Sequence, residues 1–405
     1  MKRILKIVPE GRRVSGINCT VLNSVGYDAA QPVPAQDHAS IRIKAITSCG
    51  FSDVIAPAVR GKTPERITRS IDPIRPYCLK NVTFSTDQLL FRKAGFALIP
   101  YGNHQQICRL SFRNGQNCVH EHGNNLIFKN RRTKNLEKGI CAFGNESYNW
   151  YHWLIEILPT VMLAERLPNE FSDYPFLVPE NILDNKNFRD SFEIFRRDRP
   201  VMPLRRDHDY RVKELVVIPP PTMGPINMKT QSWPVPSDYT QNIEIMSEFR
   251  ERVLEAVLPT NFSESSRRVF LARPPSSRSY NHMEIEGIAV DRGFELIRPE
   301  KLTFQEQVEL FQTARIVVGP SGAAWACSIF LNPRAHNLVW TLENYAGGCF
   351  FSNLTLLSGA DLNYLLVSPE VPISDTHDAF SAPYKVDPDL FAAELDALEQ
   401  ACNDC

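Results

Sequence analysis

The sequence predicts an α/β fold with mostly parallel β-sheets, divided between two domains. From residue 175 onward, short apolar segments alternate with helical segments, a pattern typical of βαβ units. The length of 405 residues exceeds that of one ordinary domain. A proline-dense segment at residues 219–236 is too stiff for a helix or a central strand, which indicates a boundary between the two halves.

These observations set the predicted domain limits. An N-terminal α/β domain covers residues 1–218 and begins with a β-rich cap, because residues 1–100 are rich in proline and glycine and short of helical periodicity. Residues 219–236 form the linker, and a second α/β domain covers residues 237–385. Residues 386–405 form a C-terminal helix or tail.

The cap contains two predicted strand segments and one metal-like cluster. Residues 41–46 alternate like a half-buried strand, and residues 88–99 form a bent strand or a hairpin. In the cluster His120-Glu121-His122, the two imidazoles lie on one face of a strand and could share an ion. No third ligand is evident nearby, so we favour an exposed polar loop and expect no bound metal.

The composition excludes several classes of protein. With 45 basic and 46 acidic residues the net charge is -1, so no overall positive field attracts nucleic acid. No apolar run reaches the length of about 18 residues that suits a membrane-spanning helix, and the N-terminus lacks the apolar core of a secretory signal. The ten cysteines are scattered, and the one Cys-x-x-Cys, from Cys402 to Cys405, ends the chain. We therefore expect a cytoplasmic protein with reduced thiols and no transmembrane segment.

A helix is predicted over residues 149–161. Its apolar stripe consists of Trp150, Trp153, Leu154, Ile157, Leu158 and Val161. A second face carries Asn149, His152 and Glu156. Pro159 should end or kink the helix because it has no N–H for the Ile155 carbonyl.

His152 and Glu156 lie one helical turn apart, so the carboxylate can orient the imidazole or raise its pKa. Spacing alone favours a core helix in which the two residues simply form a hydrogen bond. The flanking Trp150 and Trp153 also fit a sugar-binding site, where flat aromatic faces meet the C–H faces of a sugar ring.

The remaining elements follow the α/β rhythm. In the first half we predict strands at residues 175–178 and 214–218 and a helix at 187–197. In the second half, strands are predicted at residues 268–273, 294–297, 314–318, 337–342 and 361–367. Helices are predicted at 238–258 with Ser237 as the N-cap, at 283–292, after Thr303 with a capping box to Glu306, and at 345–357 ending at Gly359.

A candidate anion site follows the strand at residues 314–318. The turn Gly319-Pro320-Ser321-Gly322 leads into a helix, so free backbone N–H groups and a positive dipole end converge. Many such turns bind nothing, so the turn alone is a weak signal. Arg273 and Arg278 follow another strand end and could reach the same anion, as a diphosphate requires. The alternative, that both are surface arginines, stays open.

Three segments resemble motifs of glycosyltransferase family 61. Residues 149–159 resemble its "YYHWL..(D/E).LPR" motif. Arg273 and residues 278–281 resemble its "R…R.i.N" segment, with Glu284 at the following acidic position. Residues 304–311 and 318–323 resemble its "F.EQv.lf…A…vG.HGAGL.N..F" block. The likeness spans residues 140–365, with departures at Ser321 for a frequent His, Trp325 for Leu and Cys327 for Asn.

The resemblance implies a GT-B-like architecture, in which two Rossmann-like domains face a cleft and residues 237–385 bind the nucleotide-sugar. It implies an inverting, metal-independent transfer to a saccharide or lipid-linked saccharide acceptor, with the nucleotide-sugar as co-substrate and no other cofactor. Bacterial relatives act in capsular polysaccharide or exopolysaccharide synthesis, whereas plant and animal relatives act in the secretory pathway. The expected location is cytoplasmic, with peripheral association at the inner face of the membrane.

The resemblance also assigns roles to residues. The donor diphosphate would contact Arg273, Arg278, Asn281, Ser321, Gly322 and Ala323. The acceptor would contact Asn149, Trp150 and Trp153. His152 would be the general base oriented by Glu156, or Glu156 would itself be the base.

Two other functions remain as alternatives. Ser321 and Cys327 also fit a non-catalytic saccharide- or nucleotide-binding protein with a degenerate GT-B fold. A nucleotide-dependent oxidoreductase is disfavoured, because no Gly-x-Gly-x-x-Gly follows a strand with an acidic residue downstream.

Overall fold

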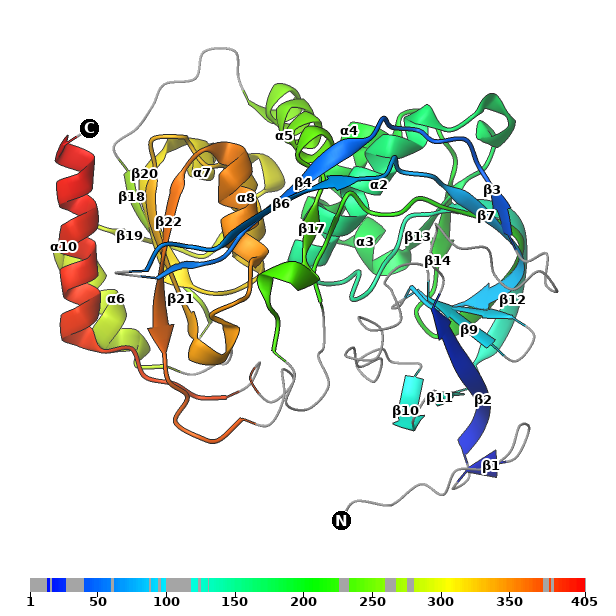
Figure 1. Cartoon of the computed structure of the whole chain (residues 1–405), viewed down its shortest axis with the longest axis horizontal. Coiled ribbons are helices and arrows are strands. Elements are labelled where there is room, and N and C mark those ends of the chain that lie inside the picture. Colours follow the sequence, from blue (N-terminus) through cyan, green and yellow to red (C-terminus); the bar gives the residue numbers. More distant parts are fainter. Residues whose placement is uncertain are drawn as a thin grey trace. The chain divides into compact units, whose positions relative to one another are not determined.

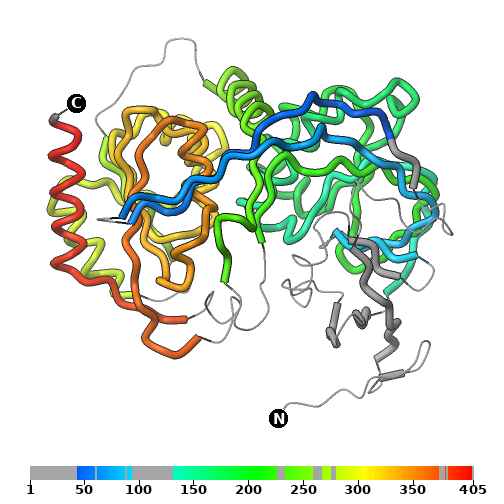
Figure 2. The backbone as a smooth tube through the Cα atoms, in the orientation of Figure 1, coloured from blue at the N-terminus to red at the C-terminus, as the bar shows by residue number. Residues whose placement is uncertain are grey.

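The chain forms two structural units, and each unit contains two separate segments of the sequence (Figures 1 and 2). Unit 1 comprises Met1–Cys49 and Asp72–Pro221, and unit 2 comprises Gly50–Ile71 and Thr222–Cys405. The computed structural model describes residues 13–14, 17–26, 40–59, 62–86, 89–93, 96–99, 118–122, 125–129, 131–225, 233–258, 267–274, 280–373, 379 and 382–404, with the backbone alone at 13–42, 96–99, 118–129 and 404.

This division differs from the predicted domain limits in two places. Residues 50–71, expected in the N-terminal domain, belong to unit 2. Within the predicted linker at 219–236, residues 219–221 belong to unit 1, whereas the described residues from Thr222 onward join unit 2, where β16 (Thr222–Met223) pairs with β17 (Thr240–Gln241). Alternating hydrophobicity identifies a strand but not the sheet that it joins, so neither assignment could be predicted from the sequence.

Unit 1 is built on one mixed sheet in the order β10-β11-β2-β9-β8-β7-β15-β12-β13-β14. The strands β15, β12, β13 and β14 run parallel, as predicted, whereas β7 and β8 are antiparallel to their neighbours. Their bounds are β1 Arg13–Val14, β2 Ile17–Gly26, β3 Ser40–Arg42, β7 Tyr77–Phe84, β8 Phe91–Lys93, β9 Phe96–Ile99, β10 Cys118–His122, β11 Asn125–Lys129, β12 Arg132–Cys141, β13 Phe176–Pro179, β14 Val201–Leu204 and β15 His208–Val217.

The predicted helix at residues 149–161 is present, but its middle is a π-helix. In η1 (His152–Ile157) the N–H of Leu158 bonds to the carbonyl of Trp153, five residues back. The chain then tightens into α2 (Leu158–Leu163), so Pro159 lies in a first turn, where its missing N–H costs little. Pro159 therefore does not end the helix. The other helices of unit 1 are η2 Ala164–Arg166, η3 Asn169–Phe171, α3 Glu180–Asp184 and α4 Lys186–Arg196.

Unit 2 contains a parallel sheet in the order β19-β18-β20-β21-β22-β5, which is doubly wound. The chain adds β19 on one side of β18 and then places β20, β21 and β22 on the other side. The strands are β5 Ala58–Val59, β18 Arg267–Leu271, β19 Glu295–Ile297, β20 Ala314–Pro320, β21 His336–Leu342 and β22 Asp361–Val367, with a hairpin of β4 Gly50–Ile55 and β6 Arg66–Ile71.

The helices of unit 2 largely follow the prediction. Thr303 and Glu306 form the expected capping box, and Gly359 ends α8 with a φ of 76°. The predicted N-cap Ser237 is wrong: Pro236–Asp238 forms a separate turn, and Asn242 caps the helix by accepting from the N–H of Ile245. The helices are η4 Pro236–Asp238, α5 Ile243–Val257, α6 His282–Asp291, η5 Pro299–Lys301, α7 Phe304–Thr313, η6 Ala323–Phe330, η7 Glu343–Tyr345, α8 Phe350–Ser358 and α10 Pro388–Asp404.

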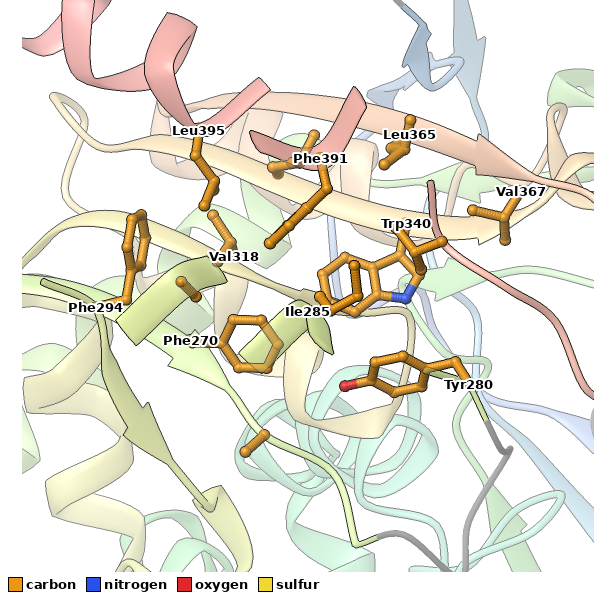
Figure 3. Packing of buried hydrophobic residues seen from close by; sticks show 14 of the residues in the cluster. Phe270, Tyr280, Ile285, Phe294, Val318, Trp340, Leu365, Val367, Phe391 and Leu395 are labelled. Atoms are coloured by element: carbon orange, nitrogen blue, oxygen red, sulfur yellow. The ribbon is translucent and has the colours of Figure 1, made fainter. Parts of the chain in front are cut away.

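The C-terminal helix α10 is part of the unit 2 core. Figure 3 shows Phe391 and Leu395 of α10 facing Val318 and Trp340 of the sheet, and all four side chains are fully buried. The rings of Phe391 and Trp340 meet edge to face at 5.6 Å. Residues 386–405 are therefore an integral layer rather than a tail. In the part of the chain that the structure describes, no helix has the length and apolarity to cross a membrane.

Candidate active site

The strand order of unit 2 reverses between β18 and β20, and ligands of doubly wound sheets bind at such a reversal, outside the carboxyl ends of the strands. Arg273 follows β18 at this edge, and the Ser321–Gly322 turn follows β20. The guanidinium of Arg273 donates a hydrogen bond through Nη2 to the carbonyl oxygen of Ser321. The structure thus brings Arg273 and the turn together, as the sequence predicted.

Gly322 makes this approach feasible. A Cβ atom at this position would lie 2.5 Å from Nη2 of Arg273. The backbone of Gly322 is extended, with φ 179°, so any residue could adopt it, and the constraint is the space that the guanidinium occupies. Gly322 precedes η6, whose first N–H groups have no partners within the helix.

Several polar atoms near Arg273 are buried without a hydrogen-bond partner among the described residues. They are Nη1 of Arg273, the hydroxyl of Tyr280 and both ring nitrogens of His282. Buried polar groups are nearly always paired, so unpaired ones gathered together indicate a place for a ligand. Burial lowers the pKa of Arg273, but a guanidinium keeps its charge at neutral pH.

Ser321 does not offer its N–H to a ligand, in contrast to the prediction. That N–H donates to the carbonyl of Trp340 at 2.9 Å and continues the pairing of β20 with β21. Of the three predicted backbone donors, those of Gly322 and Ala323 remain, at the entrance to η6.

Asn281 has a structural role that the sequence did not predict. Its Oδ1 accepts from the N–H of Val386, and its Nδ2 donates to the carbonyl of Val386, both at 3.0 Å. Its Nδ2 also donates to Glu284 at 2.7 Å. The Asn281 amide therefore connects the start of α6 to the segment before α10 by hydrogen bonds, instead of remaining available to the nucleotide-sugar donor. The predicted ligand Arg278 lies outside the described residues.

In unit 1, His152 and Glu156 form the predicted pair. Nδ1 of His152 lies 3.0 Å from Oε2 of Glu156, and the side chains are 9% and 14% exposed. Burial acts to lower the pKa of His152, but Glu156 and, less strongly, Glu146 outweigh it, and the net result is a raised pKa. Because Nδ1 faces a carboxylate, that nitrogen carries the proton in the neutral ring and Nε2 presents the lone pair.

Glu146 is a third member of this group that the sequence analysis did not identify. Its Oε2 lies 4.0 Å from Nε2 of His152, and its backbone is left-handed with φ 50°. The adjacent Ser147 is buried, and its hydroxyl accepts from the N–H of Gly144 at 2.9 Å. Asn145 accepts from the N–H of Leu89 at 2.9 Å. These bonds hold Glu146 in a conformation that a non-glycine residue rarely adopts and that often occurs at functional sites.

The three predicted acceptor contacts have local structural roles. Asn149 caps the helix, since its Oδ1 accepts from the N–H of Tyr151 at 2.9 Å. Trp150 packs edge to face on Phe188 with the ring centroids 5.0 Å apart. Trp153 is fully buried. This burial corrects the expectation that Trp153 presents a flat face to a sugar, because its ring lies in the core.

Among the described side chains, no group of three or more His, Cys, Asp or Glu is arranged to hold a metal ion. The backbone at His120 and His122 is a strand, as the cluster required, but the side chains lie outside the described part of the chain. Cys405 also lies outside it.

The candidate residues thus form two groups, one in each unit. His152, Glu156 and Glu146 belong to unit 1, and the group around Arg273 belongs to unit 2. Sequence reasoning missed Glu146, Tyr280 and His282. Tyr280 and His282 flank the motif residue Asn281, which was the one available signal.

A family model described as Glycosyltransferase 61 matches residues 150–338. The matched region begins two residues before His152 and runs through Arg273 and the Ser321–Gly322 turn into β21. No curated protein matches the chain. Residues 150–338 therefore form a glycosyltransferase family 61 domain, and the protein is a glycosyltransferase.

Proposed function

We propose that this glycosyltransferase transfers a sugar, with inversion, from a nucleotide-sugar to a saccharide or lipid-linked saccharide. In this proposal the molecule is GT-B-like, with the donor bound by unit 2 and the acceptor by unit 1. The observation that carries the proposal is Arg273 at the strand-order reversal of unit 2, with a buried Nη1 that has no partner among the described residues. A diphosphate supplies the acceptor oxygens that this group lacks.

The chain's own charges suit a metal-independent reaction. As the bond between the sugar C1 and the phosphate oxygen breaks, negative charge develops on the leaving nucleoside diphosphate. The guanidinium of Arg273, with the N–H groups at the start of η6, is placed to stabilise that charge. In this mechanism a fixed cation does the electrostatic work that a divalent metal does elsewhere.

The base in this mechanism is His152. Its Nε2 takes the proton of the acceptor hydroxyl as the oxygen attacks C1 from the face opposite the phosphate. Glu156 holds Nδ1 and stabilises the imidazolium that forms. Glu156 is the less suitable base because its carboxylate faces the ring of His152.

We propose the cytoplasmic face of a bacterial membrane as the location, and capsular polysaccharide or exopolysaccharide as the product. The six cysteines with described side chains form no disulfide, which fits a reducing compartment; they are Cys49, Cys78, Cys141, Cys327, Cys349 and Cys402. Cell fractionation tests the location, and loss of one sugar from the surface polysaccharide of a deletion strain tests the product.

The direct test measures binding and turnover together. Thermal unfolding is followed with a panel of nucleoside diphosphates and nucleotide-sugars, for the wild type, Arg273→Ala and the control Arg267→Ala. A ligand at a hundredfold excess over its Kd adds about 2.7 kcal/mol of stability. Arg267 opens β18 on the surface, paired with Glu295, so its substitution removes the same charge away from the site.

We expect one nucleotide class to stabilise the wild type and Arg267→Ala but not Arg273→Ala, with release of nucleoside diphosphate from the matching nucleotide-sugar. Equal stabilisation of all three proteins would refute the donor site. Saturable binding without release of nucleoside diphosphate, across a panel of saccharide acceptors, would contradict the proposed transfer.

A further inference from the structure

Tyr280 and His282 form a buried aromatic pair at the start of α6. Their ring centroids lie 3.6 Å apart, and the backbone N–H of His282 donates a hydrogen bond to the backbone carbonyl of Tyr280 at 2.8 Å. Tyr280 is 7% exposed, and the side chain of His282 is 11% exposed. The hydroxyl of Tyr280 and both nitrogens of His282 lack partners among the described residues. The nearest carboxylate oxygen, Oε1 of Glu286, lies 3.8 Å from Nδ1, beyond hydrogen-bond range.

Packing explains why rings are present at these positions but not why they are polar. Tyr280 stacks on Tyr384 at 5.7 Å and meets Trp340 edge to face at 5.6 Å. Figure 3 shows the ring of Tyr280 beside the indole of Trp340, at the margin of the hydrophobic cluster. A phenylalanine would pack equally well there without a buried, unpaired hydroxyl. The polar atoms therefore point to a partner that the described residues do not supply.

Arg273 links this pair to the donor site. Burial lowers the pKa of His282, and the positive charge of Arg273 lowers it further. Burial raises the pKa of Tyr280, and the same guanidinium acts in the opposite direction. The other groups that face the pair are Tyr384 and Glu286, and burial raises the pKa of Glu286 as well. Both effects favour the neutral form of the His282 imidazole, which lies beside a cation.

We propose that Tyr280 and His282 complete the donor site, donating hydrogen bonds to the phosphate oxygens of a nucleoside diphosphate beside Arg273, and that His282 takes up a proton as the diphosphate binds. This inference rests on the proposed function. The proton comes from solvent, and the imidazolium stays bonded to the phosphate while the C1–oxygen bond breaks and its electron pair remains on the departing oxygen. The acceptor proton goes separately to His152, so charge and atoms balance.

The chemistry of the cluster selects a phosphate over other ligands. A metal cation is repelled by Arg273, and a sugar hydroxyl leaves the buried guanidinium without a counter-charge. Phosphate oxygens only accept hydrogen bonds, and the guanidinium, the hydroxyl and the imidazolium all donate. A dianion also reverses the local field that keeps His282 neutral.

The experiment is titration calorimetry of the full chain with UDP, GDP, ADP and CDP, in two buffers of different ionisation enthalpy above neutral pH. The variants are His282→Gln, His282→Asn and Tyr280→Phe, and His336→Gln is the control. His336 begins β21, so it lies at the opposite end of a strand from the site. Thermal unfolding without ligand checks that each variant is folded.

We expect the wild type and His336→Gln to bind one of the four with net proton uptake. Both His282 variants should bind about tenfold or more weakly and take up no proton, and Tyr280→Phe should bind several-fold more weakly with uptake retained. If the variants bind as the wild type does and uptake persists, this inference is overturned while the proposed function stands. If the wild type binds none of the four, both are overturned.

Discussion

Nδ1 of His152 lies 3.0 Å from Oε2 of Glu156, one turn further along the helix that begins the family 61 domain. This part of the helix is a π-helix, in which each backbone hydrogen bond spans five residues, so the four-residue step from His152 to Glu156 lies within a single turn. The contact fixes both the orientation of the ring and the position of its proton.

Glu156→Gln should lower the pKa of His152, because it removes the nearest carboxylate that raises it. The acidic limb of kcat/KM, which reports the base of the free enzyme, should move to lower pH, and kcat should fall about tenfold or more. A pH–rate profile of the two proteins checks this. An unshifted limb with full activity would show that Glu156 does not act on His152.

The same substitution should change stability in a pH-dependent way. The folded-state pKa of His152 is raised, so the folded protein binds this proton more tightly than the unfolded chain does. The advantage of the wild type over Glu156→Gln should be complete below the unfolded histidine pKa of about 6.5 and should be lost as pH rises through the folded pKa. Urea unfolding at several pH values measures the difference.

Glu146→Gly should raise the stability of the protein and lower its turnover. Glycine relieves the left-handed backbone at φ 50°, so the free energy of unfolding should rise by about 0.5–1 kcal/mol. Turnover should fall because Nε2 of His152 loses its neighbouring carboxylate. The control Asn81→Gly, at φ 55° on an exposed part of β7, should gain stability, to a smaller extent, and keep full turnover. Full turnover in Glu146→Gly would remove Glu146 from the site.

Gly322→Ala should weaken nucleotide binding with little effect on folding. The new Cβ would lie 2.5 Å from the mobile end of Arg273, which can move aside but then leaves its place. Affinity for the nucleoside diphosphate should fall roughly tenfold or more. The control Gly287→Ala, within α6 with nothing near the added Cβ, should raise stability by about 0.5–1 kcal/mol and bind normally. Normal binding by Gly322→Ala would contradict the assigned position of Arg273.

Phe391→Ala should destabilise unit 2 by about 3–5 kcal/mol, since it removes a fully buried ring between α10 and the sheet. The neighbouring Leu390, 39% exposed, provides the comparison: Leu390→Ala should cost about 1 kcal/mol or less. Denaturant unfolding of both variants measures the difference. A small effect of Phe391→Ala would mean that α10 is dispensable for unit 2.

The features that depend only on residues close together in the sequence were predicted correctly. The capping box from Thr303 to Glu306 and the left-handed Gly359 follow from short-range hydrogen bonding and backbone sterics, and both are present. The pairing of Arg273 with the turn at Ser321 followed from the convergence of parallel strand ends.

Features that depend on distant residues were not predictable in the same way. Trp153 belongs to the periodic apolar stripe, but only the structure shows that Ser191 of α4 accepts its indole N–H at 2.9 Å in the core. Asn281 matches a motif, yet its amide is taken up by Val386, far along the chain. Glu146 lies on no periodic face, because a left-handed turn directs it toward His152.

The hairpin β4–β6 and the edge strand β5 also affect how the protein folds during synthesis. Gly50–Ile71 leaves the ribosome before Asp72–Pro221, yet belongs with strands made after Pro221. At about 5–20 residues per second, the intervening segment alone takes on the order of ten seconds to make. During that interval β5 lacks its partner strand β22, so unit 2 cannot complete its fold before the last third of the chain has emerged. Unit 1, by contrast, can complete its fold first. Expressing residues 222–405 alone would therefore give a sheet without its outermost strand.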